Sequence, residues 1–204
     1  MINISKIIAI IIVTLCLVNV SLSADGSKDD PFIVLLVPAD GGTEEGTISD
    51  FRPIFNAITK ATKYPFNIIV GQSYSAVVEG ICAGLADFAW FGPVTYVQAK
   101  NKGCVELLAV EVTKGSSFYY SGIFSKKSNR DISNIKDLIG KKVAFGDINS
   151  TSSFVFPMAM LVEAGLNPIK DLAKAQLTGS HANSLKALQA GLVDAAAASF
   201  NSYE

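Results

Sequence analysis

The sequence is poor in the residue types that bind transition metals. His181 is its only histidine, and its three cysteines, Cys16, Cys82 and Cys104, form no Cys-x-x-Cys pair. A zinc site needs three or four histidine, cysteine or carboxylate ligands close together. We therefore expect neither a metal nor another cofactor.

An excess of positive charge is also lacking. The chain has 17 Lys and Arg against 18 Asp and Glu, and its formal net charge is −1. Without residues 1–24, whose only charged side chain is Lys6, the net charge becomes −2. Because a basic surplus is what draws a protein to nucleic acid or to anionic membranes, we expect no nucleic acid partner.

The first 24 residues have the pattern of a secretory signal peptide. After Lys6, an apolar run extends from Ile7 to Val18 and gives way to small and polar residues that end at Ala24. This apolar core is short for a membrane span, which needs about 20 residues. We expect cleavage near Ala24 and export; a retained N-terminal anchor is the alternative.

Removal of the signal peptide leaves two cysteines, Cys82 and Cys104. In an oxidising compartment such a pair can form a disulfide, here between the ends of two successive predicted helices. The alternative is a pair of free thiols that pack as small hydrophobic side chains.

Strand and helix patterns alternate along the rest of the chain. Strands are predicted at 32–37, 66–70, 87–91, 105–112, 142–145, 175–178 and 194–200, and a further one starts at 118. Helices are predicted at 48–62, 74–83, 93–101, 152–164 and 182–190. This α/β alternation indicates mainly parallel sheets with helices on both faces. A polar stretch around Gly115 indicates a boundary between two lobes, residues 25–115 and 116–204, with a ligand cleft between them.

Four consecutive hydroxyl residues, Ser150 to Ser153, follow the predicted strand 142–145 and open a predicted helix. The free N–H groups of a helix start, the helix dipole and added hydroxyl donors together favour a bound anion. The alternative is that one of these hydroxyls only caps the helix.

Other turns between a strand and a helix face the same cleft. Tyr74 follows the strand 66–70 and is either a cleft residue or an aromatic side chain packed on its own lobe. His181 follows the strand 175–178 and lies in the first turn of a helix, where an anion would also be held. A lone histidine, however, is more often structural.

The chain also has a set of short motifs in a fixed order. They are Gln72-Ser73-Tyr74 with Glu79-Gly80, Asp87 to Pro93 with Tyr96, Tyr119-Tyr120-Ser121, Asn149-Ser150-Thr151-Ser152, Gly179-Ser180-His181, Ala187 to Gly191, and Val193-Asp194-Ala195. Together with the signal peptide, these motifs resemble the phosphonate and phosphite solute-binding proteins of bacterial ABC transporters. The resemblance runs from about Phe32 to the last residue, and the Asn-Ser-Thr-Ser turn with the later Gly-x-His is its most specific part.

The resemblance implies a type II periplasmic-binding-protein fold with two lobes. A monomer in the periplasm would hold phosphonate, phosphite, methylphosphonate or phosphate between the lobes and deliver it to a membrane permease without catalysis. Ser150, Thr151 and Ser152 would donate to the phosphoryl oxygens, Tyr74 would reach across from the first lobe, and His181 would add a hydrogen bond. We expect this chain to lack the C-terminal return to the first lobe, which the family normally has after this point.

Two departures from the family pattern bear on ligand choice. Phe91 stands where relatives often have a second cleft tyrosine, and no carboxylate occurs between Asp194 and Glu204, where some relatives hold an aminoalkyl group. Both departures favour phosphite or methylphosphonate over 2-aminoethylphosphonate.

Two other functions fit parts of this pattern. One is the ligand-binding ectodomain of a sensor with the same fold, which a membrane span and a cytoplasmic domain after Glu204 would reveal. The other is a secreted enzyme in which His181 activates Ser152. The sequence lacks the Gly-x-Ser-x-Gly elbow of serine hydrolases, which argues against the enzyme.

Overall fold

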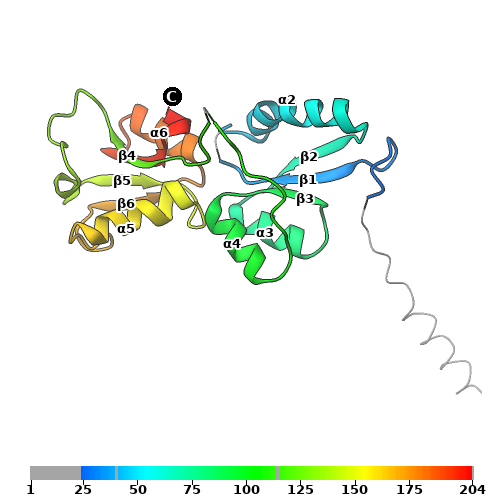
Figure 1. The fold of residues 1–204 in the computed structure, drawn as a ribbon. Coiled ribbons are helices and arrows are strands. Elements are labelled where there is room, and N and C mark those ends of the chain that lie inside the picture. Colours follow the sequence, from blue (N-terminus) through cyan, green and yellow to red (C-terminus); the bar gives the residue numbers. More distant parts are fainter. Residues whose placement is uncertain (1–23, 40, 114, 204) are drawn as a thin grey trace, which may run out of the picture.

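The computed structural model describes residues 24–39, 41–113 and 115–203. The predicted signal peptide, except for Ala24, lies outside the described residues. Two sheets lie next to each other in the molecule, each with helices on both faces (Figure 1). We call the two halves the N-terminal lobe and the C-terminal lobe. Within the described part of the chain, no helix has the length and apolar character that a membrane span requires.

The N-terminal lobe is built around a parallel sheet of order β2-β1-β3. Helix α2 covers one face of this sheet, and helices α3 and α4 lie on the other side (Figure 1). The side chains of Val34, Leu36 and Phe55 form the core between the sheet and α2. The elements run in the order β1 (Phe32–Leu36), α2 (Glu44–Thr62), β2 (Phe66–Val70), α3 (Tyr74–Cys82), β3 (Phe88–Trp90) and α4 (Pro93–Asn101).

The C-terminal lobe has a sheet of order β4-β7-β5-β6, in which only β4 runs antiparallel to its neighbour. Strand β7 is central, and its four alanines are fully buried, which lets elements on both faces pack close to its backbone. The elements are β4 (Ser121–Ser125), η1 (Ile135–Leu138), β5 (Lys142–Phe145), η2 (Thr151–Val155), α5 (Phe156–Glu163), β6 (Lys174–Leu177), α6 (His181–Gln189), β7 (Ala195–Ser199) and α7 (Phe200–Tyr203).

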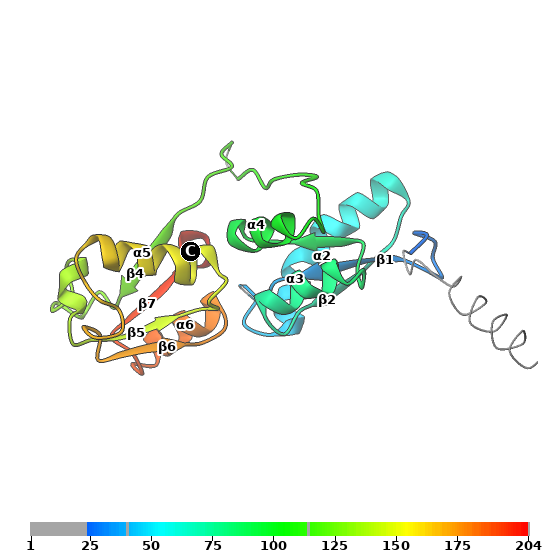
Figure 2. The same ribbon diagram turned by 90° about the horizontal axis from the view of Figure 1, so that it is seen from below.

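The strand predicted at 105–112 is wrong. This segment is part of an irregular connection that arches from α4 to β4 (Figure 2). Its side chains are open to solvent; Leu108, for example, is 77% exposed. An apolar run becomes a strand only where another strand offers a hydrogen-bonding partner, and no described strand pairs with this one. The predicted boundary between residues 115 and 116 falls within this connection and stays a prediction.

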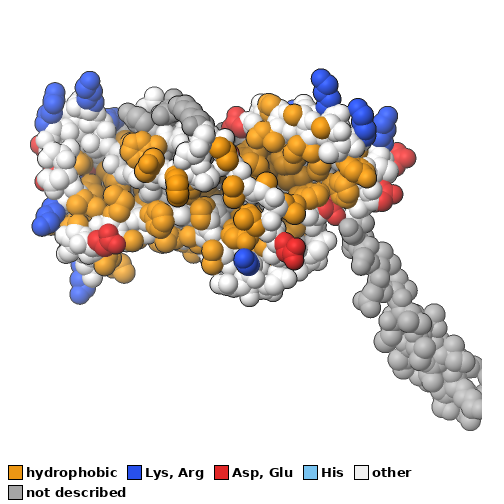
Figure 3. Space-filling model, in the orientation of Figure 1, with side chains coloured by type: hydrophobic (Ala, Val, Ile, Leu, Met, Phe, Trp, Pro, Cys, Tyr) orange, Lys and Arg blue, Asp and Glu red, His pale blue; other side chains and the backbone are white. Residues whose placement is uncertain are grey.

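Hydrophobic side chains are spread over the face shown in Figure 3, across both lobes and the region between them. The exposed side chains of the connection include Leu107, Val110, Val112, Phe118 and Tyr120. Exposed apolar side chains are thus grouped along this connection and do not only occur singly.

The charged segment that precedes β5 contains η1, which is held by a capping box. The side chain of Asn134 caps the first turn, and the carboxylate of Asp137 accepts hydrogen bonds from the backbone N–H groups of Ser133 and Asn134. These bonds hold the pKa of Asp137 below its usual range. Their contribution to stability is present above the ordinary carboxyl pKa and is lost only as the pH falls through the lowered value.

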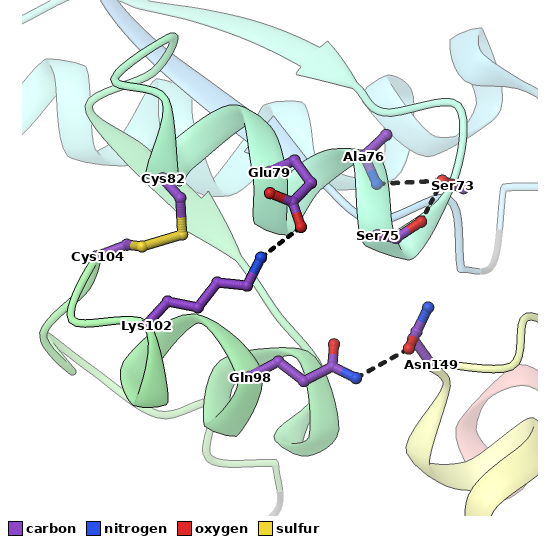
Figure 4. A network of polar contacts seen from close by, with 9 residues as sticks. All are labelled: Ser73, Ser75, Ala76, Glu79, Cys82, Gln98, Lys102, Cys104 and Asn149. Carbon is purple, nitrogen blue, oxygen red and sulfur yellow. Dashed lines mark hydrogen bonds and ion pairs between the residues drawn. A yellow bond between two sulfur atoms is a disulfide. The ribbon is translucent and has the colours of Figure 1, made fainter.

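Helices α3 and α4 are joined covalently. Cys82 ends α3 and is bonded to Cys104, which follows α4, with their Cα atoms 4.9 Å apart. Glu79 and Lys102 form an ion pair beside this disulfide (Figure 4). Because both of these side chains are largely exposed, the ion pair contributes little, and the disulfide is the main restraint at this end of the helix pair.

We expect replacement of both Cys82 and Cys104 by serine to lower the free energy of unfolding by about 3 kcal/mol. The reason is that the bridge joins residues 22 positions apart and so restricts the unfolded chain, which the variant leaves unrestricted. Urea denaturation of the oxidised protein and of the double variant measures this difference. Adding a reductant should lower the midpoint of the wild-type protein and leave the double variant unchanged. Equal midpoints for the oxidised wild type and the variant would contradict this role.

Candidate functional site

The four hydroxyl residues lie between β5 and α5 in one turn of π-helix, η2, with Ser150 as its cap. The backbone N–H of Val155 donates to the carbonyl of Ser150, and that of Phe156 donates to the carbonyl of Thr151. Each bond therefore reaches back five residues, where an α-helix would reach back four. The predicted helix at 152–164 thus begins with a widened turn.

The proline after this turn explains its shape. Pro157 has no N–H to donate to the carbonyl of Ser153, so that carbonyl accepts from the N–H of Gly146 at 3.0 Å. The carbonyl of Ser152 accepts from the Ser121 hydroxyl at 2.7 Å. Both carbonyls are thus bound to groups outside the helix, a geometry that often marks functional positions.

The widened turn leaves donors free at its start. No described residue accepts a hydrogen bond from the backbone N–H of Thr151 or of Ser152. The side chains of Ser150, Thr151 and Ser152 are at most 4% exposed. The start of a helix concentrates positive potential as well as free N–H groups. The turn therefore offers a buried set of donors to a small anion.

Ser150 is the residue that connects this turn to His181. Its hydroxyl oxygen accepts from the N–H of Ser153 at 3.2 Å and lies 3.0 Å from Nε2 of His181. The other ring nitrogen of His181, Nδ1, lies 2.8 Å from the hydroxyl of Ser202. His181 is 5% exposed, so the imidazole is buried between two hydroxyl groups.

The same turn contacts the N-terminal lobe at the starts of two helices. The hydroxyl of Thr151 accepts from the N–H of Val94 in α4 at 2.9 Å. A carboxylate oxygen of Asp147 accepts from the N–H of Tyr74 in α3 at 3.3 Å. At these two contacts, helix N–H groups of the N-terminal lobe donate to acceptors of the C-terminal lobe.

Two further hydrogen bonds join the lobes. The amide of Gln98 donates to the side-chain oxygen of Asn149 at 2.9 Å (Figure 4). The backbone N–H of His181 donates to the carbonyl of Ala39, which follows β1, at 3.1 Å. As predicted, turns that follow strands in both lobes thus meet at one interface.

The two aromatic candidates lie in the N-terminal lobe. Tyr74 is 3% exposed and packs in a cluster with Val37 and Val77, and Phe91 is half-buried against the same cluster. Tyr74 therefore fits both interpretations of the sequence, since its ring packs on its own lobe while its backbone N–H contacts the other.

The arrangement changes one pairing that the sequence suggested. The enzyme alternative places His181 against Ser152, but Nε2 of its ring lies within hydrogen-bonding distance of the Ser150 hydroxyl, at 3.0 Å. The reason is the π-turn, in which Ser150 is the cap residue that faces α6. In the described part of the chain, no three His, Cys, Asp or Glu side chains are grouped closely enough to hold a metal ion.

Sequence reasoning overlooked several contacts of this interface. Asp147 and Asn149 stand beside the four hydroxyl residues, so their position in the same turn was an available signal. Ser202 is 21 residues from His181, and no pattern in the sequence connects the two.

Comparisons with known proteins point to one family. Residues 42–204 match the family described as ABC transporter, phosphonate, periplasmic substrate-binding protein. The chain is 31% identical over 186 residues to the phosphate-import protein PhnD of Mycolicibacterium smegmatis, which covers 86% of this chain and 56% of that protein. A probable phosphite-binding protein of an ABC transporter from Prochlorococcus marinus is 30% identical over 131 residues, which cover 61% of this chain and 44% of that protein.

Solved structures agree in fold. The structure of PhnD1 from Prochlorococcus marinus in complex with methylphosphonate matches with a TM-score of 0.71 at 25% identity, covering 84% of this chain and 64% of that chain. A binding protein of a phosphonate transporter from Pseudomonas aeruginosa matches with a TM-score of 0.73 at 21% identity, covering 85% and 59%. The type II binding-protein fold is thereby confirmed. The chain spans about half the length of the curated relatives described above.

The close packing of the turn against β5 gives a test. A Cβ atom at Gly146 would lie 2.1 Å from the hydroxyl oxygen and 2.9 Å from the Cβ of Ser153, so rotating the serine would not remove the clash. We expect Gly146→Ala to lower the free energy of unfolding by about 1–3 kcal/mol, the usual cost of overpacking.

Gly92→Ala is the matched control, because its Cβ would lie at an ordinary distance of 3.6 Å from the Thr151 hydroxyl. Urea denaturation of both variants measures the difference. If Gly146→Ala were as stable as Gly92→Ala, the turn would not be packed against β5 in this way.

Proposed function

Because the chain belongs to the family of periplasmic phosphonate substrate-binding proteins of ABC transporters, we propose that it captures a small phosphorus oxyanion between its lobes for import. The observation that carries this proposal is the buried donor set of η2, which lies at the interface of the two lobes. Phosphonate, phosphite and phosphate present three or four acceptor oxygens, and a turn rich in N–H and O–H groups matches them.

The donor set needs no Lys or Arg for this task. Hydrogen bonds from neutral donors to an ionised acceptor are short and strong, and the helix start adds favourable potential. We assign the N–H groups of Thr151 and Ser152 and the hydroxyls of Ser150, Thr151 and Ser152 to the phosphoryl oxygens. Thr151 can accept from Val94 and donate to the anion at once, because a hydroxyl has one proton and two lone pairs.

That double role of Thr151 connects ligand binding to the contact between the lobes. An anion that accepts the hydroxyl proton of Thr151 would bind a residue that already accepts a hydrogen bond from the first turn of α4. Tyr74 and Phe91 would form the wall of the site on the N-terminal lobe, where Phe91 offers an aromatic face and no hydroxyl. His181 would complete the donor set, directly or through Ser150.

The remaining parts of the proposal follow from the family. We propose an exported monomer with lobes 25–115 and 116–204 that acts in the periplasm and delivers its ligand to a membrane permease, without catalysis. Relatives named as periplasmic binding proteins support this location and this partner.

We expect Thr151→Ala to weaken binding of phosphate or methylphosphonate by about 1.5–3 kcal/mol, the worth of a hydrogen bond to a charged group. Calorimetric titration measures the change in affinity, and urea denaturation reports the fold separately. Thr151→Ser keeps the hydroxyl and should bind nearly as the wild type does. Unchanged affinity in Thr151→Ala would show that the hydroxyl only connects the lobes and does not bind the anion.

We also expect the protein to bind phosphite or methylphosphonate more tightly than 2-aminoethylphosphonate. An ammonium group in a closed cleft needs a carboxylate partner, because an unpaired charge out of water is costly. Asp147 is a carboxylate that lies at this interface, and each of its oxygens already accepts from a backbone N–H group, those of Tyr74 and Asn149. Calorimetry against phosphate, phosphite, methylphosphonate and 2-aminoethylphosphonate tests the proposed function and this order together.

Phe91→Tyr returns a hydroxyl to the wall of the site and should shift the preference toward ligands with an additional acceptor. The opposite order, with 2-aminoethylphosphonate at least about tenfold tighter, would show that a carboxylate pairs with the ammonium group. Asp147→Asn would then tell whether Asp147 is that carboxylate, since the amide keeps the size and removes the charge. Binding of none of the four anions would overturn the proposed function.

A further inference from the structure

A chain of hydrogen-bonded side chains leads from the anion-binding turn to the end of the described residues. The Ser150 hydroxyl lies 3.0 Å from Nε2 of His181, and Nδ1 of His181 lies 2.8 Å from the Ser202 hydroxyl. The Ser202 hydroxyl in turn contacts that of Ser199. The side chains of Ser150, His181 and Ser199 are at most 5% exposed. These four groups come from the start of η2, the start of α6, α7 and the end of β7.

At the Ser199 end of this series of hydrogen bonds, the donor and the acceptor can be assigned. The Ser199 oxygen accepts from the backbone N–H of Ser202 at 3.1 Å, and the only described group near enough to accept the Ser199 proton is the Ser202 oxygen. A buried hydroxyl proton without an acceptor is costly. Ser199 therefore donates to Ser202, which directs the proton of Ser202 away from Ser199.

At the Ser150 end, the contact with His181 decides whether the Ser150 hydroxyl can donate a hydrogen bond to a ligand. Its oxygen already accepts from the N–H of Ser153. If Nε2 of His181 accepted the Ser150 proton, Ser150 would have no donor left for an anion. If Nε2 carries a proton instead, it fills the second lone pair of Ser150, and the Ser150 proton is directed out of the chain.

We propose that Ser202, held by Ser199, donates to Nδ1 of His181 and thereby keeps the imidazole proton on Nε2, so that the hydroxyl of Ser150 donates to the bound anion. This inference rests on the proposed function. Every donor in the chain then points the same way, from Ser199 through Ser202 and His181 to Ser150, and aligned hydrogen bonds strengthen one another. Ser199 and Ser202 are positioning residues, and His181 acts on the anion through Ser150.

The tautomer can be observed directly, because His181 is the only histidine of the chain. Long-range proton–nitrogen NMR of the nitrogen-15-labelled protein distinguishes a protonated ring nitrogen from a bare one. We expect the proton on Nε2 in the wild-type protein, both alone and with inorganic phosphate or methylphosphonate. Ser202→Ala should move proton population to Nδ1 and weaken binding of the anion about tenfold, the loss of one hydrogen bond. Ser202→Thr keeps a hydroxyl and should restore both properties.

The control is Ser128→Ala, which alters an exposed serine in the loop after β4 and should change neither the tautomer nor the affinity. A wild-type protein with a proton on Nδ1, alone or together with Nε2, would overturn the proposal, because Ser202 would then accept from the ring. An unchanged tautomer or an unchanged affinity in Ser202→Ala would overturn it as well. Failure of the wild-type protein to bind any of the four anions would overturn the proposed function, whereas binding with Nδ1 protonated would overturn only the role of Ser202.

Discussion

The missing amide proton of Pro157 is the constraint on which the rest of the site depends. A regular α-helix would use the carbonyls of Ser152 and Ser153 for its own first turns, and the proline makes one of these bonds impossible. Both carbonyls instead bind neighbouring elements, through Ser121 in β4 and Gly146 after β5. These two bonds hold the widened turn against the C-terminal sheet, while the Thr151 hydroxyl of the same turn contacts the N-terminal lobe.

This geometry explains how the two lobes meet. Thr151 and Asp147 accept from the first N–H groups of α4 and α3, so the N-terminal lobe presents helix starts to the turn while the turn presents acceptors. The same two helices are fastened at their opposite ends by the disulfide between Cys82 and Cys104. A covalent restraint at one end and the interface at the other keep α3 and α4 in a fixed relation to the η2 turn.

Much of the fold was predictable from local patterns. The strand at 66–70 was predicted with its observed bounds, because β-branched and aromatic residues stand between clear turn residues. Helices α3 and α4 were predicted within a residue of their ends, since Ser73 and Pro93 mark their starts. The strand at 105–112 was wrong, because its residues favour a strand only when a neighbouring strand is present to pair with them.

The sequence by itself determined the class of the fold and the chemistry of the site. Hydrophobic periodicity sets which segments become helices and strands, and four hydroxyl residues at a helix start are a donor set wherever that helix lies. Only the tertiary structure decided which groups those hydroxyls face. The partners of Ser150, Thr151 and Asp147 come from segments 31, 57 and 73 residues away along the chain. Such contacts depend on how two sheets and their helices pack, and a local pattern contains no information about groups so distant in sequence.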